Sequence, residues 1–196
     1  MLADSRPSKI FWALREMGVD VPLLLLRLPT LSRVAEVVRV ADMSLVSSLV
    51  TIKALAGAAR SEGRCHRGIL MVDVGDLREG VWPDRAVEIV RSTKGLSGFE
   101  LVGLGCNLAC FGGVMPTPEN IGQLVALREI CRRRRVWSYR CSRVGAPTPC
   151  RCLFRIACLA RSTTFVSARA SCLGVIPAIV LPGRVPVRIL SWRSPK

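Results

Sequence analysis

From its first residue to Cys131 the chain alternates short runs of Val, Leu and Ile with longer amphipathic stretches, and Gly or Pro stands at most of the joins. Strands that are apolar on both faces and separated by helices indicate a parallel sheet covered by helices. The expected strands are 2–5, 22–26, 43–47, 69–74 and 99–104, and the expected helices are 8–17, 31–41, 49–62, 83–94 and one from 118 to at least 130. This order fits a doubly wound sheet or a (β/α) barrel, and a barrel of about five βα units would be incomplete because closure takes eight.

The balance of charge changes abruptly at Arg132. Residues 1–131 carry 14 acidic and 15 basic side chains, whereas residues 132–196 carry 13 Arg, one Lys and no Asp or Glu. Nearly all of the net charge of +15 therefore lies in the last 65 residues, which also hold five of the nine cysteines. No apolar period in that segment lasts beyond about two helical turns. We therefore expect a folded domain over 1–131 and a basic, irregular and disordered tail over 132–196.

Neither a secretory signal nor a membrane span is apparent in the sequence. The N-terminus mixes Asp4, Arg6 and Lys9 with apolar residues, and the longest apolar runs, 21–26 and 172–181, fall well short of the roughly 20 residues that cross a bilayer. Cysteines in a chain without a signal are expected to be reduced thiols. The expected location is the cytoplasm, with no membrane partner.

The chain offers little for metal or triad chemistry. Its one histidine, His66, excludes zinc sites that need two His and most nucleophile–His arrangements, and we expect it to be a solvated loop residue. The pairs Cys106/Cys110 and Cys150/Cys152 lack C-x-x-C spacing, so they are expected to be structural or accidental thiols. No metal site is expected.

Two segments follow expected strands directly and carry polar or glycine residues. Residues 73–80 (DVGDLREG) come after the fourth expected strand, and residues 103–113 (GLGCNLACFGG) after the fifth. The carboxyl ends of parallel strands form the edge at which α/β barrels keep their chemistry, and the glycines allow a ligand or another backbone to approach closely.

These two segments, with residues 2–6 (LADSR) and 21–27 (VPLLLLR), resemble the alanine racemase N-terminal-domain family and its ornithine-racemase-like branch; residues 69–80 (ILMVDVGDLREG) are close to a signature of that branch. The resemblance covers about 1–131 and implies a partial (β/α) TIM-type barrel of an amino-acid racemase that uses pyridoxal 5'-phosphate. By this resemblance Arg78 lies near the phenolic oxygen of the cofactor and the substrate carboxylate. Asn107 takes the position behind the pyridine ring, and a homodimer of the intact protein is compatible with the family.

The chain also departs from the family pattern. The family's Schiff-base lysine precedes the segment that matches residues 2–6, and Lys9, Lys53 and Lys94 fall on expected helices or at their ends. No catalytic lysine is therefore identified. The family's phosphate-binding motifs are also missing, so a polypeptide with this sequence is expected to be inactive and not to bind the cofactor.

Those missing motifs can be recovered in another reading frame. When the last base of each codon is joined to the first two of the next, residues 161–166 can encode VNHLR and residues 142–153 can encode GGxxNSLPL. Both are family motifs in the family's order, so we infer a frameshift near residues 131–135. Two other hypotheses remain: a basic binding protein whose tail engages nucleic acid, another polyanion or a membrane, and a cofactor-carrying homologue without racemase activity. Non-specific attraction to polyanions would follow from the charge alone, and no specific nucleic-acid partner is expected.

The frameshift hypothesis makes a prediction about the gene. The alternative frame should be open from about Arg132 through the family's C-terminal domain, because charge, cysteine use and motifs all change at that point. Resequencing the locus with its flanking bases tests this, and stop codons scattered through that frame would contradict it.

Overall fold

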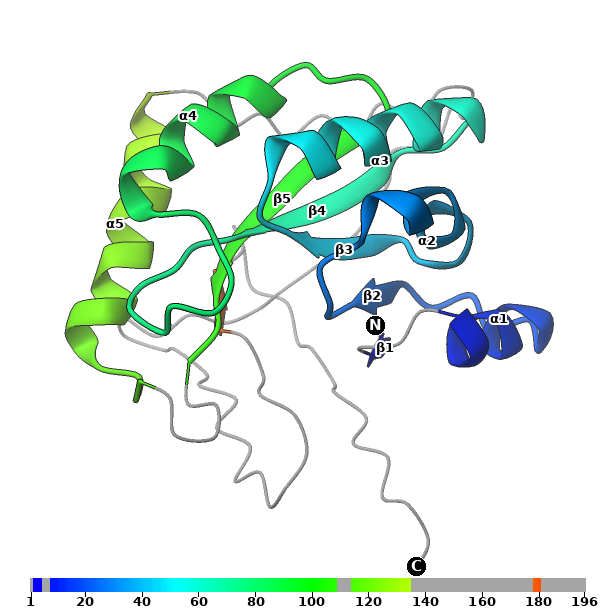
Figure 1. The fold of residues 1–196 in the computed structure, drawn as a ribbon, viewed down its shortest axis with the longest axis horizontal. Coiled ribbons are helices and arrows are strands. Elements are labelled where there is room, and N and C mark those ends of the chain that lie inside the picture. The colour runs from blue at the N-terminus through cyan, green and yellow to red at the C-terminus, as the bar shows by residue number, and fades with distance from the viewer. Residues whose placement is uncertain (1, 5–7, 109–113, 135–177, 181–196) are drawn as a thin grey trace, which may run out of the picture.

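The computed structural model describes residues 2–4, 8–108, 114–134 and 178–180. Five parallel strands lie side by side in chain order in one sheet: β1 (Leu2–Asp4), β2 (Leu23–Leu25), β3 (Met43–Val46), β4 (His66–Met71) and β5 (Phe99–Cys106) (Figure 1). A sixth strand, β6 (Ala178–Val180), pairs with β5 in the antiparallel sense. The expected α/β fold with about five βα units is confirmed.

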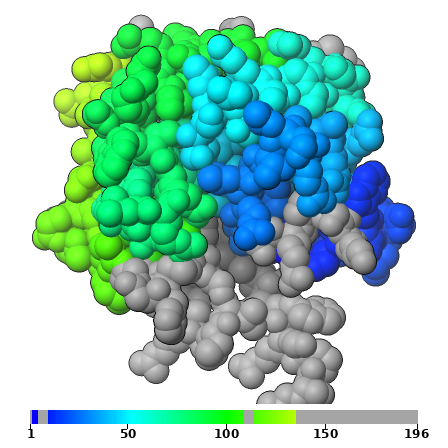
Figure 2. All heavy atoms as spheres, in the orientation of Figure 1, coloured from blue at the N-terminus to red at the C-terminus, as the bar shows by residue number. Residues whose placement is uncertain are grey.

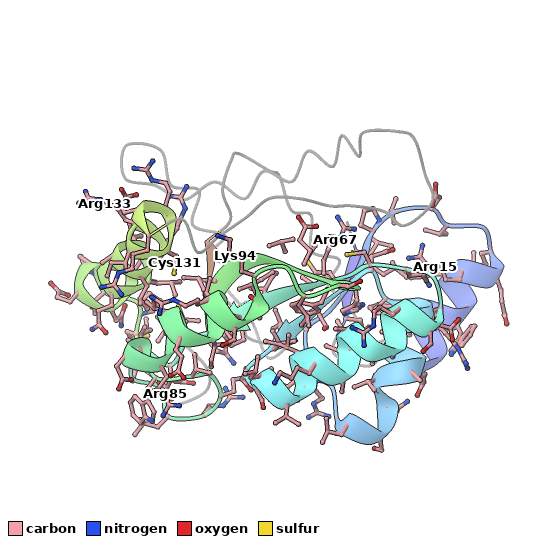
Figure 3. The ribbon with its side chains drawn as sticks, turned by 90° about the horizontal axis from the view of Figure 1, so that it is seen from above. Arg15, Arg67, Arg85, Lys94, Cys131 and Arg133 are labelled. Carbon is pink, nitrogen blue, oxygen red and sulfur yellow. The ribbon has the colours of Figure 1, made fainter. Side chains whose placement is uncertain are left out.

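Helices connect the parallel strands and share one face of the sheet. They are α1 (Ser8–Glu16), the 3₁₀ turn η1 (Leu31–Arg33), α2 (Val34–Val40), α3 (Leu49–Ser61), α4 (Pro83–Thr93) and α5 (Pro118–Arg133). Figure 3 shows the helices α2, α3 and α4 along one side of the strands. In Figure 2 the atoms of α2, α3 and α4 form a continuous surface over the sheet.

Local sequence signals account for where these helices begin. The Ser48 hydroxyl oxygen accepts a hydrogen bond from the Val50 backbone N–H at the start of α3. At the start of α5, the Thr117 side chain and the Asn120 side chain each accept from the other residue's backbone N–H. Both arrangements satisfy N–H groups that a helix leaves unpaired at its first turn. Proline occupies the first position of α4 and of α5, where its missing N–H costs nothing.

Both faces of the sheet are buried. The outer face packs against the helices in one large apolar cluster, to which α3 contributes Ile52 and Leu55 and α5 contributes Leu124 and Leu127. The inner face, the side that faces the axis in a barrel, holds a second cluster formed by Leu24, Met43, Leu45, Ile69 and Met71. Continuous apolar runs are what a sheet buried on both faces requires, so the sequence pattern and the packing agree.

One strand lies earlier in the chain than expected. Residues 69–74 were expected to form the fourth strand, whereas β4 spans His66–Met71. The strand stops at Met71 because the chain then folds back: the Val81 N–H donates to the Met71 carbonyl and the Asp73 N–H donates to the Val81 carbonyl, both at 2.9 Å. The apolar side chains of Val72 and Val74 still enter the outer core, which explains why they resemble strand residues in the sequence.

His66 corrects a second expectation. It is the first residue of β4 and only 2% exposed, not a solvated loop residue. Its Nε2 lies 2.9 Å from the Ser44 hydroxyl oxygen, and its ring centroid lies 6.4 Å from that of Phe99. Burial lowers the pKa of His66 to about 4, so the side chain is neutral at pH 7.

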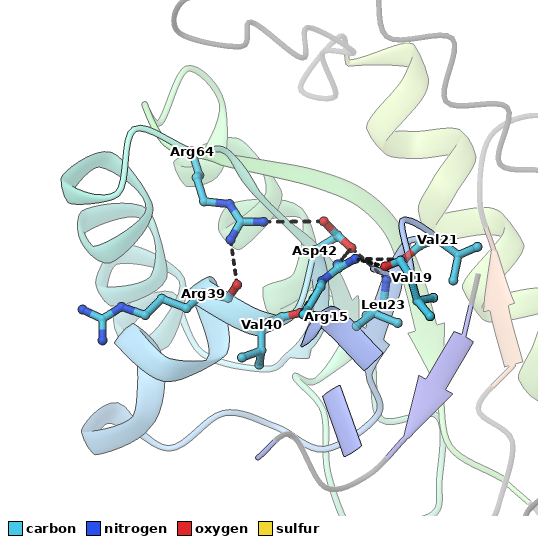
Figure 4. A network of polar contacts seen from close by, with 8 residues as sticks. All are labelled: Arg15, Val19, Val21, Leu23, Arg39, Val40, Asp42 and Arg64. Atoms are coloured by element: carbon cyan, nitrogen blue, oxygen red, sulfur yellow. Dashed lines mark hydrogen bonds and ion pairs between the residues drawn. The ribbon is translucent and has the colours of Figure 1, made fainter. Parts of the chain in front are cut away.

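A charged network holds the amino-terminal ends of the strands (Figure 4). Asp42, just before β3, forms ion pairs with Arg15 of α1 and, at 3.8 Å, with Arg64 just before β4. Its carboxylate also accepts from the Leu23 N–H at 2.8 Å, which fixes the start of β2. Arg15 in turn donates to the carbonyl of Val19 at 2.9 Å, so one arginine ties the end of α1 to the sheet.

The expected boundary at residue 132 falls inside a helix. α5 continues through Arg132 and Arg133 before it ends at Arg134. Of the expected tail, residues 178–180 form β6 on the edge of β5, and the rest lies outside the described residues apart from the end of α5.

Two glycines in the segment between β4 and α4 differ in how tightly they are packed. Gly75 and Gly80 have φ angles of 127° and 126°, a region that side chains rarely enter. A Cβ atom on Gly80 would lie 2.6 Å from the Asp73 nitrogen, whereas a Cβ on Gly75 would meet nothing within 4 Å.

We expect His66 to make stability depend on pH. The folded state keeps His66 neutral down to a pH of about 4, while the unfolded chain protonates it near 6.5. The free energy of unfolding should therefore be highest above pH 6.5 and fall towards pH 4, by roughly 3 kcal/mol in all. Urea unfolding at pH 7, 6 and 5 measures this. His66 is the chain's one histidine, so His66→Gln should flatten the profile between pH 7 and 5; an equal slope in the variant would contradict the assignment.

We expect Gly80→Ala to destabilise the fold more than Gly75→Ala. Both substitutions force a side chain into the same φ region, at a cost of about 1 kcal/mol, but only the methyl group added at position 80 also meets the backbone, which should add at least about 1 kcal/mol. Urea midpoints of the two variants measure the difference. Equal midpoints would show that the segment opens freely around residue 80.

Candidate functional site

The two segments singled out in the sequence meet at the carboxyl edge of the sheet. Residues 73–80 follow β4, and Asn107 follows β5 directly. β4 and β5 pair along their full length, which brings their carboxyl ends together. β5 extends to Cys106, two residues beyond the expected end at 104, so Gly105 lies within the strand and not in the loop that was expected there. Residues 109–113 lie outside the described residues.

Asp73 organises the segment after β4. Its Oδ1 accepts from the Gly75 N–H at 2.9 Å and from the Leu77 N–H at 3.2 Å. Leu77 adopts a φ of 53°, which is unusual for a residue other than glycine. The carboxylate therefore shapes a tight turn that presents residues 76–79 at the edge.

Arg78 lies at this edge with its side chain 47% exposed. Its Nη1 is 3.8 Å from Oδ2 of Asp76, whose side chain is only 5% exposed. The other oxygen of Asp76 accepts from the Val114 N–H at 3.3 Å, which connects the segment after β4 with the chain that leads to α5. Arg78 thus has a guanidinium that solvent and ligands can reach, beside a carboxylate that they reach much less.

Asn107 is tied to the same segment. Its Nδ2 donates to Oε1 of Glu79 at 2.6 Å. The structure therefore links the two predicted site residues indirectly: Glu79, which binds Asn107, is the residue directly after Arg78, and Asp76, which pairs with Arg78, lies two residues before it. Sequence reasoning missed these two acids as site residues, although both stand in the DVGDLREG segment it had singled out.

Two buried oxygen atoms at this edge have no hydrogen-bond partner among the residues the structure describes: Oδ2 of Asp76 and Oδ1 of Asn107. Most buried polar atoms in folded proteins are paired, so these two mark a place where a partner is missing. Both are acceptors, and the missing partner is therefore a donor.

No lysine is found at this edge in the described part of the chain. Lys9 belongs to α1, Lys53 is exposed on α3, and Lys94 follows the last residue of α4 (Figure 3). Arg85 and Arg133, on α4 and α5, also lie on the outer helices and away from the strands. Lys9, Lys53 and Lys94 thus lie on helices or at a helix end, as expected from the sequence. That none of them takes the role of the family's lysine stays a prediction.

The described residues hold neither a cluster of metal-ligating side chains nor a helix of membrane-spanning character. There, no three His, Cys, Asp or Glu side chains come together as a metal site. Among the described helices, none has the length and apolar character needed to span a membrane. Cys65, Cys106 and Cys131 form no disulfide among the described residues, and Cys110, Cys150 and Cys152 lie outside them.

Residues 11–145 match the alanine racemase N-terminal domain family. This match continues past residue 131, where the resemblance was expected to end. Among curated proteins, a lysine racemase from Thermotoga maritima is 36% identical over 129 residues, which are 66% of this chain and 35% of the relative. An ornithine racemase from Acetoanaerobium sticklandii is 40% identical over 110 residues, which are 56% of this chain and 31% of the relative. The chain thus spans about a third of the length of these relatives.

Solved structures show the same fold at lower identity. An alanine racemase from Clostridium difficile 630 superposes with a TM-score of 0.55 and 20% identity, and the likeness covers 68% of this chain and 34% of that one. PipY from Synechococcus elongatus, solved with pyridoxal 5'-phosphate bound, gives a TM-score of 0.55 at 17% identity, over 69% of this chain and 65% of that one. A family match over more than half of the sequence, on a parallel sheet whose carboxyl edge carries Arg78 and Asn107, places this chain in the alanine racemase N-terminal domain family.

Proposed function

We propose that this chain is part of an amino-acid racemase of the alanine/ornithine type that uses pyridoxal 5'-phosphate. The observation that carries the proposal is the link between Asn107 and the segment that holds Arg78, made by Glu79 at the carboxyl edge of the sheet. Family membership and the lysine and ornithine racemases among the relatives support the reaction class. The cytoplasmic location expected from the sequence, and a homodimer of the intact protein, belong to the same proposal.

Arg78 and Asn107 are the residues proposed to bind cofactor and substrate. The guanidinium of Arg78 is a permanent cation with several N–H donors, so it suits the substrate carboxylate or the phenolic oxygen of the cofactor. Asp76 pairs with it at 3.8 Å and limits the positions it can take. Asn107, held by Glu79 at 2.6 Å, would support the pyridine ring from behind.

The described residues do not fit a covalently held cofactor. When bound, this cofactor stabilises the carbanion that forms at the α-carbon during racemisation, and a lysine is needed to hold it and to exchange the proton. None of the described residues at the carboxyl edge is a lysine. We therefore propose that the polypeptide with this sequence is inactive, that its folded domain is the part up to about residue 131, and that residues 132–196 are out of frame.

A second function is suggested by the charge alone. Residues 132–196 carry 14 basic and no acidic side chains, which would give salt-dependent binding to any polyanion. A specific nucleic-acid partner would add a defined site size. Binding that weakens steeply with salt and shows no site size would be explained by charge without a dedicated function.

We expect the purified 196-residue chain to hold no cofactor covalently. After incubation with pyridoxal 5'-phosphate and reduction with borohydride, its intact mass should not increase at Lys9, Lys53 or Lys94 above the level of a lysine-containing control protein. Racemisation of alanine and ornithine should remain at background. A stoichiometric mass increase at one of these lysines would contradict the proposal of inactivity.

In a protein with the family's upstream strand and the alternative frame restored, Arg78→Ala should lower kcat/KM by at least about 100-fold, since it removes a charged group at the reacting edge. Arg60→Ala removes the same charge from the outer helix α3, where Arg60 is exposed, and should change kcat/KM by less than about twofold. Equal effects of the two substitutions on alanine and ornithine would mean that the reacting edge is wrongly placed.

A further inference from the structure

The outer edge of β5 is covered by a strand from a distant part of the chain. Residues 104–106 pair with residues 178–180 in the antiparallel sense, so β6 (orange) lies beside the carboxyl end of β5 (Figure 1). In the sequence, residues 134–177 separate β6 from α5. Every other pair of neighbouring strands that the structure describes is parallel. The covering of β5 therefore differs in kind from the rest of the sheet.

The backbone of β5 shows which groups β6 satisfies. The Gly105 carbonyl accepts from the Val72 N–H at 2.7 Å, so the backbone groups of Gly105 point towards β4. Because the backbone groups of successive strand residues point to opposite sides, those of Leu104 and Cys106 point away from β4 and towards β6. Their partners are the last and first residues of β6, and each such antiparallel pair exchanges two hydrogen bonds. β6 thus satisfies the donors and acceptors that the end of β5 would otherwise offer to another strand.

β6 presents a much shorter edge than the one it covers. Of its three residues only Ile179, opposite Gly105, has backbone groups that point away from β5. In the sequence, Pro177 directly precedes the strand and Pro182 follows two residues after its end. Proline lacks an N–H, so neither residue can donate to a further strand. Short edge strands and prolines are means by which proteins end a sheet without attracting another strand.

We propose that the outer edge of β5 at residues 104–106 is a strand-accepting site, which takes a short extended apolar segment in the antiparallel sense and is filled by the chain's own β6. In such a site the main-chain hydrogen bonds supply most of the attraction, and the small and β-branched residues of β6 (AIV) suit an extended backbone. The inference is independent of the proposed racemase function.

A strand in this site also acts as a competitor. A closed barrel requires a further strand along the outer edge of β5, because every strand of a barrel has two neighbours. While β6 is in place, no other strand can pair with residues 104–106. The site is therefore both the end of the sheet in this chain and the place where any extension of the sheet has to displace β6.

The test measures amide hydrogen exchange in the ¹⁵N-labelled 196-residue chain and in two proline variants. Val180→Pro removes an N–H that faces β5, so the amides of Leu104 and Cys106 should exchange at least about tenfold faster. Ile179→Pro is the matched control, because it places proline at an N–H that points away from β5 and should change these two rates by less than about twofold. The Gly105 N–H faces β4 and should stay protected in both variants, which shows that the sheet is intact.

A peptide added in trans tests the acceptor directly. A synthetic peptide of residues 176–182, with two lysines added at one end for solubility, should restore the protection of Leu104 and Cys106 in Val180→Pro in a saturable way. The same peptide carrying Val180→Pro should not. If the variant also loses protection at Gly105, the peptide is added to the wild-type chain instead. An excess should then displace β6 and shift the Val180 resonance while Leu104 stays protected.

Four results would overturn the proposal. Amides of Leu104 and Cys106 that exchange in the wild-type chain as fast as in an unstructured peptide would show that the edge is not covered. Equal effects of the two proline variants would show that the ladder with β6 is not responsible for the protection. No saturable response to the peptide up to about millimolar concentration would show that the edge accepts no strand in trans. Protection that rises with chain concentration would show that a second copy, and not the chain's own β6, fills the site.

Discussion

The structure depends on burying both faces of one parallel sheet. The helices cover the outer face, and the inner face gathers Leu24, Met43, Leu45, Ile69 and Met71, each at most 1% exposed. Burial of this kind stabilises the fold by about 25 cal/mol for each Å² of apolar surface, but it leaves little place for polar groups along the strands. Charged and polar side chains therefore concentrate at the two ends of the strands. The amino-terminal and carboxyl ends differ in how these groups are paired.

At the amino-terminal ends, polar groups satisfy one another. Asp42 forms ion pairs with Arg15 and Arg64, and its carboxylate accepts a hydrogen bond from the Leu23 N–H (Figure 4). Both of its oxygens therefore have partners within the fold. At the carboxyl ends, Asp76 and Asn107 each keep a buried oxygen without a partner in the described residues. This asymmetry agrees with the general division in α/β barrels, where one edge supports stability and the other carries chemistry.

The sequence predicted most elements because apolar runs, prolines and glycines report local structure directly. It also indicated that residues 73–80 and Asn107 follow strands, which the structure shows. The roles of Arg78 and Asn107 came from the resemblance to a known family and stay a prediction. It failed at His66 and at the start of β4 because a polar residue at a strand end carries no periodic signal; its burial depends on Ser44, 22 positions away. The hydrogen bond between Asn107 and Glu79 could not be predicted from the sequence either. It joins residues 28 positions apart, which meet only because β4 and β5 are neighbours in the sheet.

At the end of α5 the change in charge balance at Arg132 can be seen in the ion pairs. Glu129 is the last acidic residue of the sequence, and its carboxylate accepts from Arg132 at 2.7 Å and from Arg133 at 3.0 Å. The hydrogen bond from Arg132 is the main reason that the pKa of Glu129 falls to about 2. Beyond this point no arginine has a carboxylate of the later sequence to pair with. The Asp and Glu side chains with which those arginines could pair therefore all belong to residues 1–129.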